Sequence, residues 1–295
     1  MVSVIYCFDT SALNALHDDP DCEALTARLL ATNTLQISAL NVDEVCATSD
    51  ASRARSLVGL LRRILGDRGP WKAPNLLLQE LTLAFTRKET RVLLSVGPDT
   101  APAYRAVLSG GLGLTEGFRA FIKRWHKDSE DVFRGVFEKA RPAFQKLFKD
   151  GKAKTPRSRS ALIRHYCKDE EFIQQYVGSI YKRLVGTHLT ATGLHKLFCA
   201  VPSWVLYLGG WALSVYERDI QGTAYGAGRK GKSGKKPGTH DLQCAIYLPY
   251  CDRFITADPK QRRALRILNV FNPRNPRTKI ISYEALKSGL LVPRH

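Results

Sequence analysis

Four acidic side chains have the placement that metal-dependent chemistry requires. Each comes at or just after the end of an expected strand, or at the start of an expected helix: Asp9, Glu44, Asp241 and Asp258. Carboxylates that are crowded together raise one another's pKa unless a cation neutralises them. Hard oxygen ligands without His or Cys suit Mg²⁺ or Mn²⁺, which can polarise a phosphoryl oxygen and generate hydroxide from water. The four residues therefore predict a divalent metal site if the fold brings them together.

Each of these residues also has an ordinary structural explanation. An Asp that follows a strand often caps the next helix, and an acidic residue in the first turn of a helix complements the helix dipole. The metal hypothesis therefore depends on the four side chains meeting at one place.

The elements that would position them alternate between strand and helix at both ends of the chain. The expected strands are residues 2–8, 34–39, 253–256 and 278–282. A helix that starts at Leu40 would carry Glu44 in its first turn, and a helix that starts at Asp241 would be stopped by Pro249. Such alternation is typical of an α/β fold with a parallel sheet, in which ligands bind at the carboxyl ends of the strands.

The middle of the chain has a different pattern. Strand signals are scarce between residues 50 and 235, whereas residues 57–65 form an amphipathic helical pattern that Gly66 ends. We therefore predict a parallel-sheet core that is interrupted by a long, mainly helical insertion. The expected divisions are 1–66 and 203–295 for the two parts of the core, the second including a basic loop at 226–238, and 67–202 for the insertion.

The charge of the chain favours a polyanionic partner. It has 45 Lys and Arg residues against 27 Asp and Glu residues, a formal net charge of +18. Such an excess attracts nucleic acid or an anionic membrane surface, although a basic surface can also serve solubility alone. Two basic stretches stand out, one from Lys149 to Arg159, which we expect to be exposed, and one from Arg229 to Lys236.

The second basic stretch overlaps a P-loop pattern. Residues 226–233 satisfy G-x-x-x-x-G-K-[ST]. A working P-loop needs a buried strand before it and a helix after it, so that backbone amides converge on phosphate. Here no buried strand precedes the pattern, and residues 234–238 cannot open a helix. The favoured interpretation is a flexible basic loop that follows a phosphate backbone. A solvated linker, or a nucleotide-driven enzyme that uses Lys232, is the alternative.

Cysteine usage and hydropathy favour a cytoplasmic protein. Seven cysteines without a C-x-x-C pair indicate neither a disulfide framework nor a structural zinc site. The N-terminus has no basic region before its apolar run, unlike a signal peptide. Residues 198–216 carry no charge, but Pro202 and the Gly209-Gly210 pair interrupt them. We therefore favour a buried core helix over a membrane span and expect no membrane partner.

Four segments together resemble the PIN-domain nucleases, in the same order along the chain. They are Phe-Asp-Thr-Ser-Ala-Leu at 8–13, Ile-Ser-Ala-Leu-Asn-Val-Asp-Glu-Val at 37–45, His-Asp at 240–241 and Phe-Ile-Thr-Ala-Asp at 254–258. The opening Asp-Thr-Ser and the closing Thr-x-Asp are the most specific pieces. The likeness covers roughly the first 50 and the last 60 residues.

The resemblance implies a three-layer α/β/α core and a metal-dependent ribonuclease. Such an enzyme cuts phosphodiester bonds by attack of water and leaves 5′-phosphate and 3′-hydroxyl ends. By this likeness, Mg²⁺ or Mn²⁺ would be bound by Asp9, Glu44, Asp241 and Asp258. The hydroxyls of Thr10 or Ser11, and of Thr256, would orient the carboxylates or the water. Asp43 would be a substitute for Glu44, and Asp252 for Asp258.

The long helical span distinguishes this chain from the compact members of that family, which include toxins of toxin–antitoxin pairs. We hypothesise that the chain binds RNA through its two basic stretches: Lys152, Lys154, Arg157, Arg159, Arg229, Lys230, Lys232, Lys235 and Lys236. Single-stranded DNA is an alternative ligand, and an antitoxin or a second copy of the chain is an open partner. The rival function is that of an RNA- or single-stranded-DNA-binding protein whose acidic site is silent.

Overall fold

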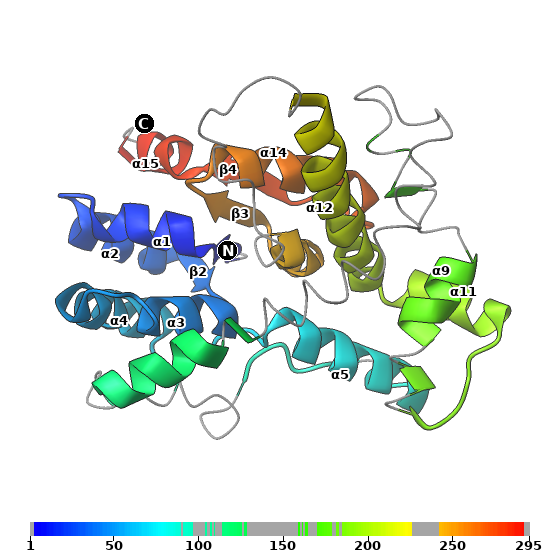
Figure 1. The fold of residues 1–295 in the computed structure, drawn as a ribbon. Coiled ribbons are helices and arrows are strands. Elements are labelled where there is room, and N and C mark those ends of the chain that lie inside the picture. Colours follow the sequence, from blue (N-terminus) through cyan, green and yellow to red (C-terminus); the bar gives the residue numbers. More distant parts are fainter. Residues whose placement is uncertain are drawn as a thin grey trace.

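The computed structural model describes residues 3–89, 91–96, 104, 107, 109, 114–125, 127–128, 159, 161, 163–164, 170–178, 181–182, 185–225 and 242–291. These residues form an α/β structure whose four-stranded sheet is parallel throughout (Figure 1). The strands are β1 (Val4–Phe8), β2 (Asn33–Gln36), β3 (Arg253–Thr256) and β4 (Lys279–Ser282). The predicted parallel sheet is therefore confirmed, and strands from the two ends of the chain lie side by side.

The strand order, β2-β1-β3-β4, creates a switch point in the middle of the sheet. From β1 the chain first moves to one side, to β2, and returns much later to the other side, where Phe8 pairs with Ile255 of β3. A crevice opens beyond the carboxyl ends of the strands where the direction of winding reverses. Asp9 follows β1 directly, and Asp258 follows β3 after one intervening residue.

Helices account for most of the remaining described structure. The N-terminal ones are α1 (Thr10–His17), α2 (Cys22–Thr32), α3 (Ala39–Cys46), α4 (Ala51–Leu65) and α5 (Pro74–Arg87). Those that follow are α9 (Glu170–Ile173), α11 (Ala191–Ala200), α12 (Ser203–Tyr225), α14 (Pro259–Leu268) and α15 (Tyr283–Leu291). A π-helical turn, η1 (Gln174–Gly178), and two 3₁₀ segments, η2 (Cys244–Tyr250) and η3 (Asn269–Phe271), complete the set.

Alternate side chains of β1 point into two hydrophobic cores on opposite faces of the sheet. Tyr6 and Phe8 join a core with residues of α1, α2, α3, α4 and α15. Cys7, between them, joins a second core with residues of α5, α11, α12, α14 and η2. A strand that is buried on both faces needs helices on both sides, because successive side chains point in opposite directions. The predicted three-part division of the chain stays a prediction.

A local signal placed the end of one helix correctly. Helix α4 ends at Leu65, and Gly66 follows with a φ of +55°, a conformation that suits glycine. The expected strand at 34–39 is shorter than predicted, because Ser38 caps α3. The Ser38 hydroxyl accepts from the backbone N–H of Asn41, and the Asn41 side-chain oxygen, Oδ1, accepts from the backbone N–H of Ser38. Glu44 therefore lies in the second turn of α3 and not in the first.

Pro249 does not stop the segment that follows Asp241. Asp241 itself lies outside the described residues, and the 3₁₀ segment η2 continues through Pro249 to Tyr250. Side chains support this segment from outside: the Leu248 carbonyl accepts hydrogen bonds from Asn272 Nδ2 (3.3 Å) and from the Thr278 hydroxyl. The prediction that Pro249 ends the helix was wrong. The N–H that Pro249 lacks would bond the Ile246 carbonyl in a 3₁₀ segment, and the Ser203 hydroxyl donates to that carbonyl instead, at 3.3 Å.

The uncharged stretch 198–216 forms parts of two helices and not one central helix. Helix α11 ends at Ala200 and α12 begins at Ser203, on either side of Pro202. Gly210 allows α12 to approach the chain at Leu242, since an added Cβ would lie 2.9 Å from the Leu242 carbonyl oxygen. Among the described residues, no single helix is long and apolar enough to cross a membrane. Helix α11 and residues 203–214 of α12 are long and apolar enough only when they are taken together, and the two helices meet at a bend of 98°.

Candidate active site

Three of the four predicted acidic residues line one small pocket at the carboxyl edge of the sheet. The pocket has a volume of about 60 Å³ and is lined by Asp9, Thr10, Ser11, Leu40, Asn41, Glu44, Cys244, Asp258 and Gln261. These residues come from the ends of β1 and β3, from α1, α3 and α14, and from η2. The fourth acidic residue, Asp241, lies outside the described residues. The switch point of the sheet thus gathers side chains that are far apart in the sequence.

Asp9 is buried and held on both of its oxygens. Its Oδ1 accepts from the Ala12 amide at 2.7 Å, which makes Asp9 the N-cap of α1. Its Oδ2 accepts from Thr256 Oγ1 at 2.8 Å, and Ser11 Oγ lies 2.9 Å from both oxygens. The contacts of Asp9 with Ser11 and Thr256 fix the plane of this carboxylate.

Ser11 also ties α1 to the turn that leads into α14. Its Oγ accepts from the amides of Ala257 (2.9 Å) and Asp258 (3.1 Å). Asp258 in turn caps α14, since its Oδ1 accepts from the amides of Lys260 (2.6 Å) and Gln261 (3.2 Å). Asp9 and Asp258 therefore each cap a helix, as expected for an Asp that follows a strand, and each also lines the pocket.

Glu44 is oriented by a chain of polar side chains from two helices. Thr10 Oγ1 donates a hydrogen bond to Glu44 Oε2, and Asn41 Nδ2 donates to Thr10 Oγ1 at 2.9 Å. Asn41 is fixed by the capping box with Ser38, where its Oδ1 accepts from the Ser38 hydroxyl at 2.7 Å. Sequence reasoning missed Asn41, although its position three residues after Ser38 is a capping-box signal.

Gln261 was also missed. It lies within α14, is almost fully buried, and places its Oε1 2.7 Å from Thr256 Oγ1. Its position in the first turn after Asp258 was visible in the sequence, but nothing there distinguished it from a surface glutamine. Gln261 supports the hydroxyl that donates to Asp9.

Neither of the two substitute carboxylates lines the pocket. Asp43 is half-buried, and burial raises its pKa to about 7. Asp252 precedes β3 and so lies at the amino edge of the sheet, opposite to the pocket. There its Oδ2 accepts from the Ile5 amide at 2.8 Å, and its other oxygen forms an ion pair with Arg274. The suggestion that Asp252 could replace Asp258 is therefore incompatible with its place in the fold.

Of the nine basic residues assigned to nucleic-acid binding, one is described. Those outside the described residues are Lys152, Lys154, Arg157, Arg229, Lys230, Lys232, Lys235 and Lys236. Arg159 is 8% exposed, so the expectation that the stretch is exposed does not hold at its last residue. Arg159 lines a cavity beside α14 instead.

The pocket's donors suit a hydrated divalent ion. Among the described residues, no group of three or more His, Cys, Asp or Glu side chains is arranged to hold a metal ion directly. Mg²⁺, however, usually keeps several waters and is bound by only one or two carboxylates together with substrate phosphate. The carboxylates of Asp9, Glu44 and Asp258 provide hard oxygen donors of that kind.

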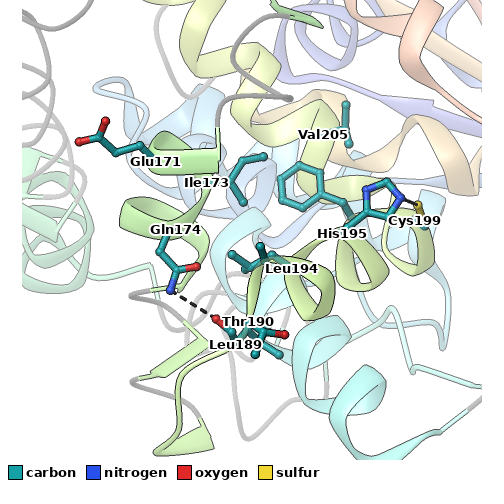
Figure 2. Close-up of a pocket in the computed structure, with 11 residues that line it drawn as sticks. Glu171, Ile173, Gln174, Leu189, Thr190, Leu194, His195, Cys199 and Val205 are labelled. Atoms are coloured by element: carbon teal, nitrogen blue, oxygen red, sulfur yellow. Dashed lines mark hydrogen bonds between the residues drawn. The ribbon is translucent and has the colours of Figure 1, made fainter.

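A larger cavity lies in the helical part of the molecule (Figure 2). It has a volume of about 760 Å³, is mainly apolar, and lies between α9 and η1 on one side and α11 on the other. His195 and Cys199, one turn apart on α11, bring Nε2 and Sγ to 3.6 Å. None of the six cysteines in the described part of the chain, Cys199 included, forms a disulfide. The cavity shares no lining residue with the acidic pocket, and the sequence analysis did not foresee it.

Comparisons with known proteins add no relative. No family model, no curated protein and no solved structure has significant similarity to the chain. The interpretation of the acidic pocket therefore rests on its geometry and chemistry.

Proposed function

We propose that the protein is a metal-dependent endoribonuclease that hydrolyses phosphodiester bonds at the acidic pocket. One observation carries the proposal: Asp9, Glu44 and Asp258, from three separate elements, line a single pocket at the switch point of a parallel sheet. A structural cap at any one of these positions would not require the other two to be near it. The net charge of +18 supports RNA as the substrate, because it is opposite in sign to the charge of a phosphate backbone.

The carboxylates of Asp9, Glu44 and Asp258 would hold Mg²⁺ or Mn²⁺, with Asp241 as the fourth acidic residue. When bound, such an ion lowers the pKa of a water molecule and polarises a phosphoryl oxygen.

The protein's own side chains position these groups. Ser11 and Thr256 hold the Asp9 carboxylate by hydrogen bonds, and Thr10, itself oriented by Asn41, does the same for Glu44. This preorganisation lowers the cost of arranging charged groups during the reaction.

The test is cleavage of a labelled single-stranded RNA by the full chain with Mg²⁺, with Mn²⁺ and with EDTA. We expect cleavage only with a divalent ion, and ends that carry 5′-phosphate and 3′-hydroxyl groups. Asp9→Asn and Glu44→Gln should each lower the rate about 10³-fold, since each removes a charge that acts in the transition state. The matched control is Asp252→Asn, which removes a carboxylate from the opposite edge of the sheet and should leave the rate unchanged.

Two results would contradict the proposal. One is undiminished cleavage by Asp9→Asn, which would place the reaction elsewhere or reveal a contaminating nuclease. The other is the absence of cleavage with every divalent ion although the RNA binds, which would favour a nucleic-acid-binding protein with a silent acidic site.

A further inference from the structure

A second cavity lies beside α14 and is lined by arginines. Its volume is about 610 Å³, and the residues that line it are Arg159, Pro259, Arg262, Arg263, Arg266, Ile267 and Val270. Three of the arginines belong to α14, and Arg159 comes from a distant part of the chain. Arg164 adds positive charge nearby, with its guanidinium 6.0 Å from the centre of the Phe271 ring, next to Val270. The cavity therefore concentrates cationic side chains in a concave surface.

The α14 arginines have no carboxylate partner among the described residues, unlike arginines that the fold neutralises. Arg53 pairs with Asp18 and Arg274 with Asp252. Within the described part of the chain, by contrast, none of Arg262, Arg263 and Arg266 forms an ion pair, and the Arg266 guanidinium donates to the Ile280 carbonyl at 3.2 Å. Guanidinium groups that converge without counter-charges repel one another, and an anionic ligand removes that repulsion.

The cavity is next to the acidic pocket along one helix. Asp258, which lines the acidic pocket, caps α14, and Pro259, the next residue, lines the arginine cavity. At a rise of about 1.5 Å per residue, Arg262 and Arg266 lie about 6 Å and 12 Å along the helix from Asp258. Because they are four residues apart, they are on the same face of the helix. A chain of phosphates that ran along this face would pass the acidic pocket.

We propose that the arginine cavity binds the phosphate backbone of a single-stranded RNA and holds the strand next to the acidic pocket. Guanidinium groups match phosphate in planar, two-point hydrogen bonds, and they also stack on bases. The apolar side chains of Ile267 and Val270 provide surface for a sugar or a base, which inorganic phosphate alone would not use. The choice of RNA rests on the proposed function, whereas the affinity for phosphate follows from the arginines themselves.

The test compares two double variants of the full chain in EDTA, where metal-dependent cleavage is blocked. Arg262→Gln/Arg263→Gln removes two charges from the cavity. Arg266 is left in place because it also bonds to Ile280. The matched control, Arg55→Gln/Arg62→Gln, removes two charges from exposed positions of α4. Binding of a fluorescent single-stranded RNA is measured over a range of salt concentrations, and circular dichroism and thermal unfolding check that both variants remain folded.

We expect the cavity variant to bind the RNA about tenfold more weakly at low salt, and the control to bind with near-normal affinity. The slope of log affinity against log salt should become shallower by about 1.4 in the cavity variant, at about 0.7 for each phosphate contact of a single strand. A mononucleotide should bind far more weakly than the RNA and should lose affinity in the same variant. Arginine stays charged across the accessible pH range, so the loss should be the same at acidic and neutral pH.

The inference is wrong if the cavity variant keeps the normal affinity and salt slope, or if the control loses as much affinity as the cavity variant. Equal affinity for mononucleotide and RNA would also overturn it, because it would indicate a site for a single phosphate. These outcomes are independent of catalysis. If the cavity variant loses RNA binding but the normal chain never cleaves RNA, the nuclease proposal fails and the arginine cavity stands. If the chain cleaves RNA and the cavity variant binds RNA normally, the nuclease proposal stands and the inference about the arginine cavity fails.

Discussion

The acidic pocket and the arginine cavity adjoin the same helix, α14, but the fold treats their charges in opposite ways. In the acidic pocket, of about 60 Å³, hydroxyls and amides of neighbouring residues hold the carboxylates of Asp9, Glu44 and Asp258. In the cavity, of about 610 Å³, Arg262 and Arg263 have no carboxylate partner among the described residues. One site is small and internally bonded, and the other is wide and cationic.

This difference teaches which part of a reaction each site can serve. Side chains that the fold already fixes by hydrogen bonds suit a step that needs precise geometry, because little reorganisation remains to be done when the substrate arrives. Long cationic side chains around a wide cavity suit the capture of a flexible polyanion. We therefore expect changes in the acidic pocket to affect turnover, and changes in the arginine cavity to affect affinity.

Asp258 tests this division most directly, because it belongs to the pocket and begins the helix that lines the cavity. Asn is about as good an N-cap as Asp, so Asp258→Asn should preserve α14 while it removes the charge. We expect the single-turnover rate of RNA cleavage to fall about 100-fold, with RNA affinity in EDTA unchanged.

Asp258→Ala separates the capping role from the chemical one. This variant loses the cap as well as the charge, so its free energy of unfolding should fall by about 1 kcal/mol relative to Asp258→Asn. If Asp258→Asn cleaves RNA at the normal rate, Asp258 is only a helix cap and does not take part in the reaction at the acidic pocket.

A smaller effect is expected at Thr10, which orients Glu44 without itself being a carboxylate. Thr10→Val keeps the shape of the side chain but removes the hydroxyl that donates to Glu44. Loss of such a supporting contact costs about 10- to 100-fold in metal affinity or activity, so we expect a reduced rate and a higher metal requirement. Thr10→Ser keeps a hydroxyl at this position and should show nearly the normal rate and nearly the normal metal requirement. A normal rate in Thr10→Val together with a reduced rate in Thr10→Ser would indicate that the methyl group, and not the hydrogen bond, is needed.

The sequence was sufficient for the elements whose signals are local. Strands β1 and β3 and the Gly66 end of α4 were predicted because short apolar runs, β-branched residues and glycine act on their immediate neighbours. Asp9 and Asp258 could be selected for the same reason, since each follows such a run. Their meeting at one pocket follows from a parallel sheet, whose strands end at a common edge.

Features that depend on distant packing could not be predicted. Asp252 directly precedes β3, whereas Asp258 follows it after one residue, and only the pairing of β3 with β1 shows that Asp252 bonds to the Ile5 amide. The arginine cavity combines α14 with Arg159, and no sequence pattern links them. The polar chain from Asn41 through Thr10 to Glu44 likewise depends on how α1 and α3 pack.

Asp19 is a carboxylate outside the acidic pocket whose hydrogen bonds we expect to contribute to stability alone. Burial by itself would raise the pKa of Asp19, but hydrogen bonds from Lys287, from the Asp21 amide and from Tyr283 outweigh it and hold the pKa below 3.8. The Tyr283 hydroxyl, on a buried side chain, donates to Asp19 Oδ2 at 2.8 Å. None of these residues lines the acidic pocket.

Tyr283→Phe should therefore lower stability without changing cleavage. A hydrogen bond to a charged group contributes about 1.5 kcal/mol, and this contribution is present while Asp19 is ionised in the folded protein. Because the folded pKa is depressed, the stabilisation is complete above pH 3.8 and is lost as the pH falls through the lower folded value. Urea unfolding should thus show a deficit for Tyr283→Phe at neutral pH that shrinks in strong acid. A deficit that does not depend on pH would mean that the hydroxyl acts through packing and not through the Asp19 charge. A loss of cleavage would mean that carboxylates held for stability and those held for chemistry are not separable in this fold.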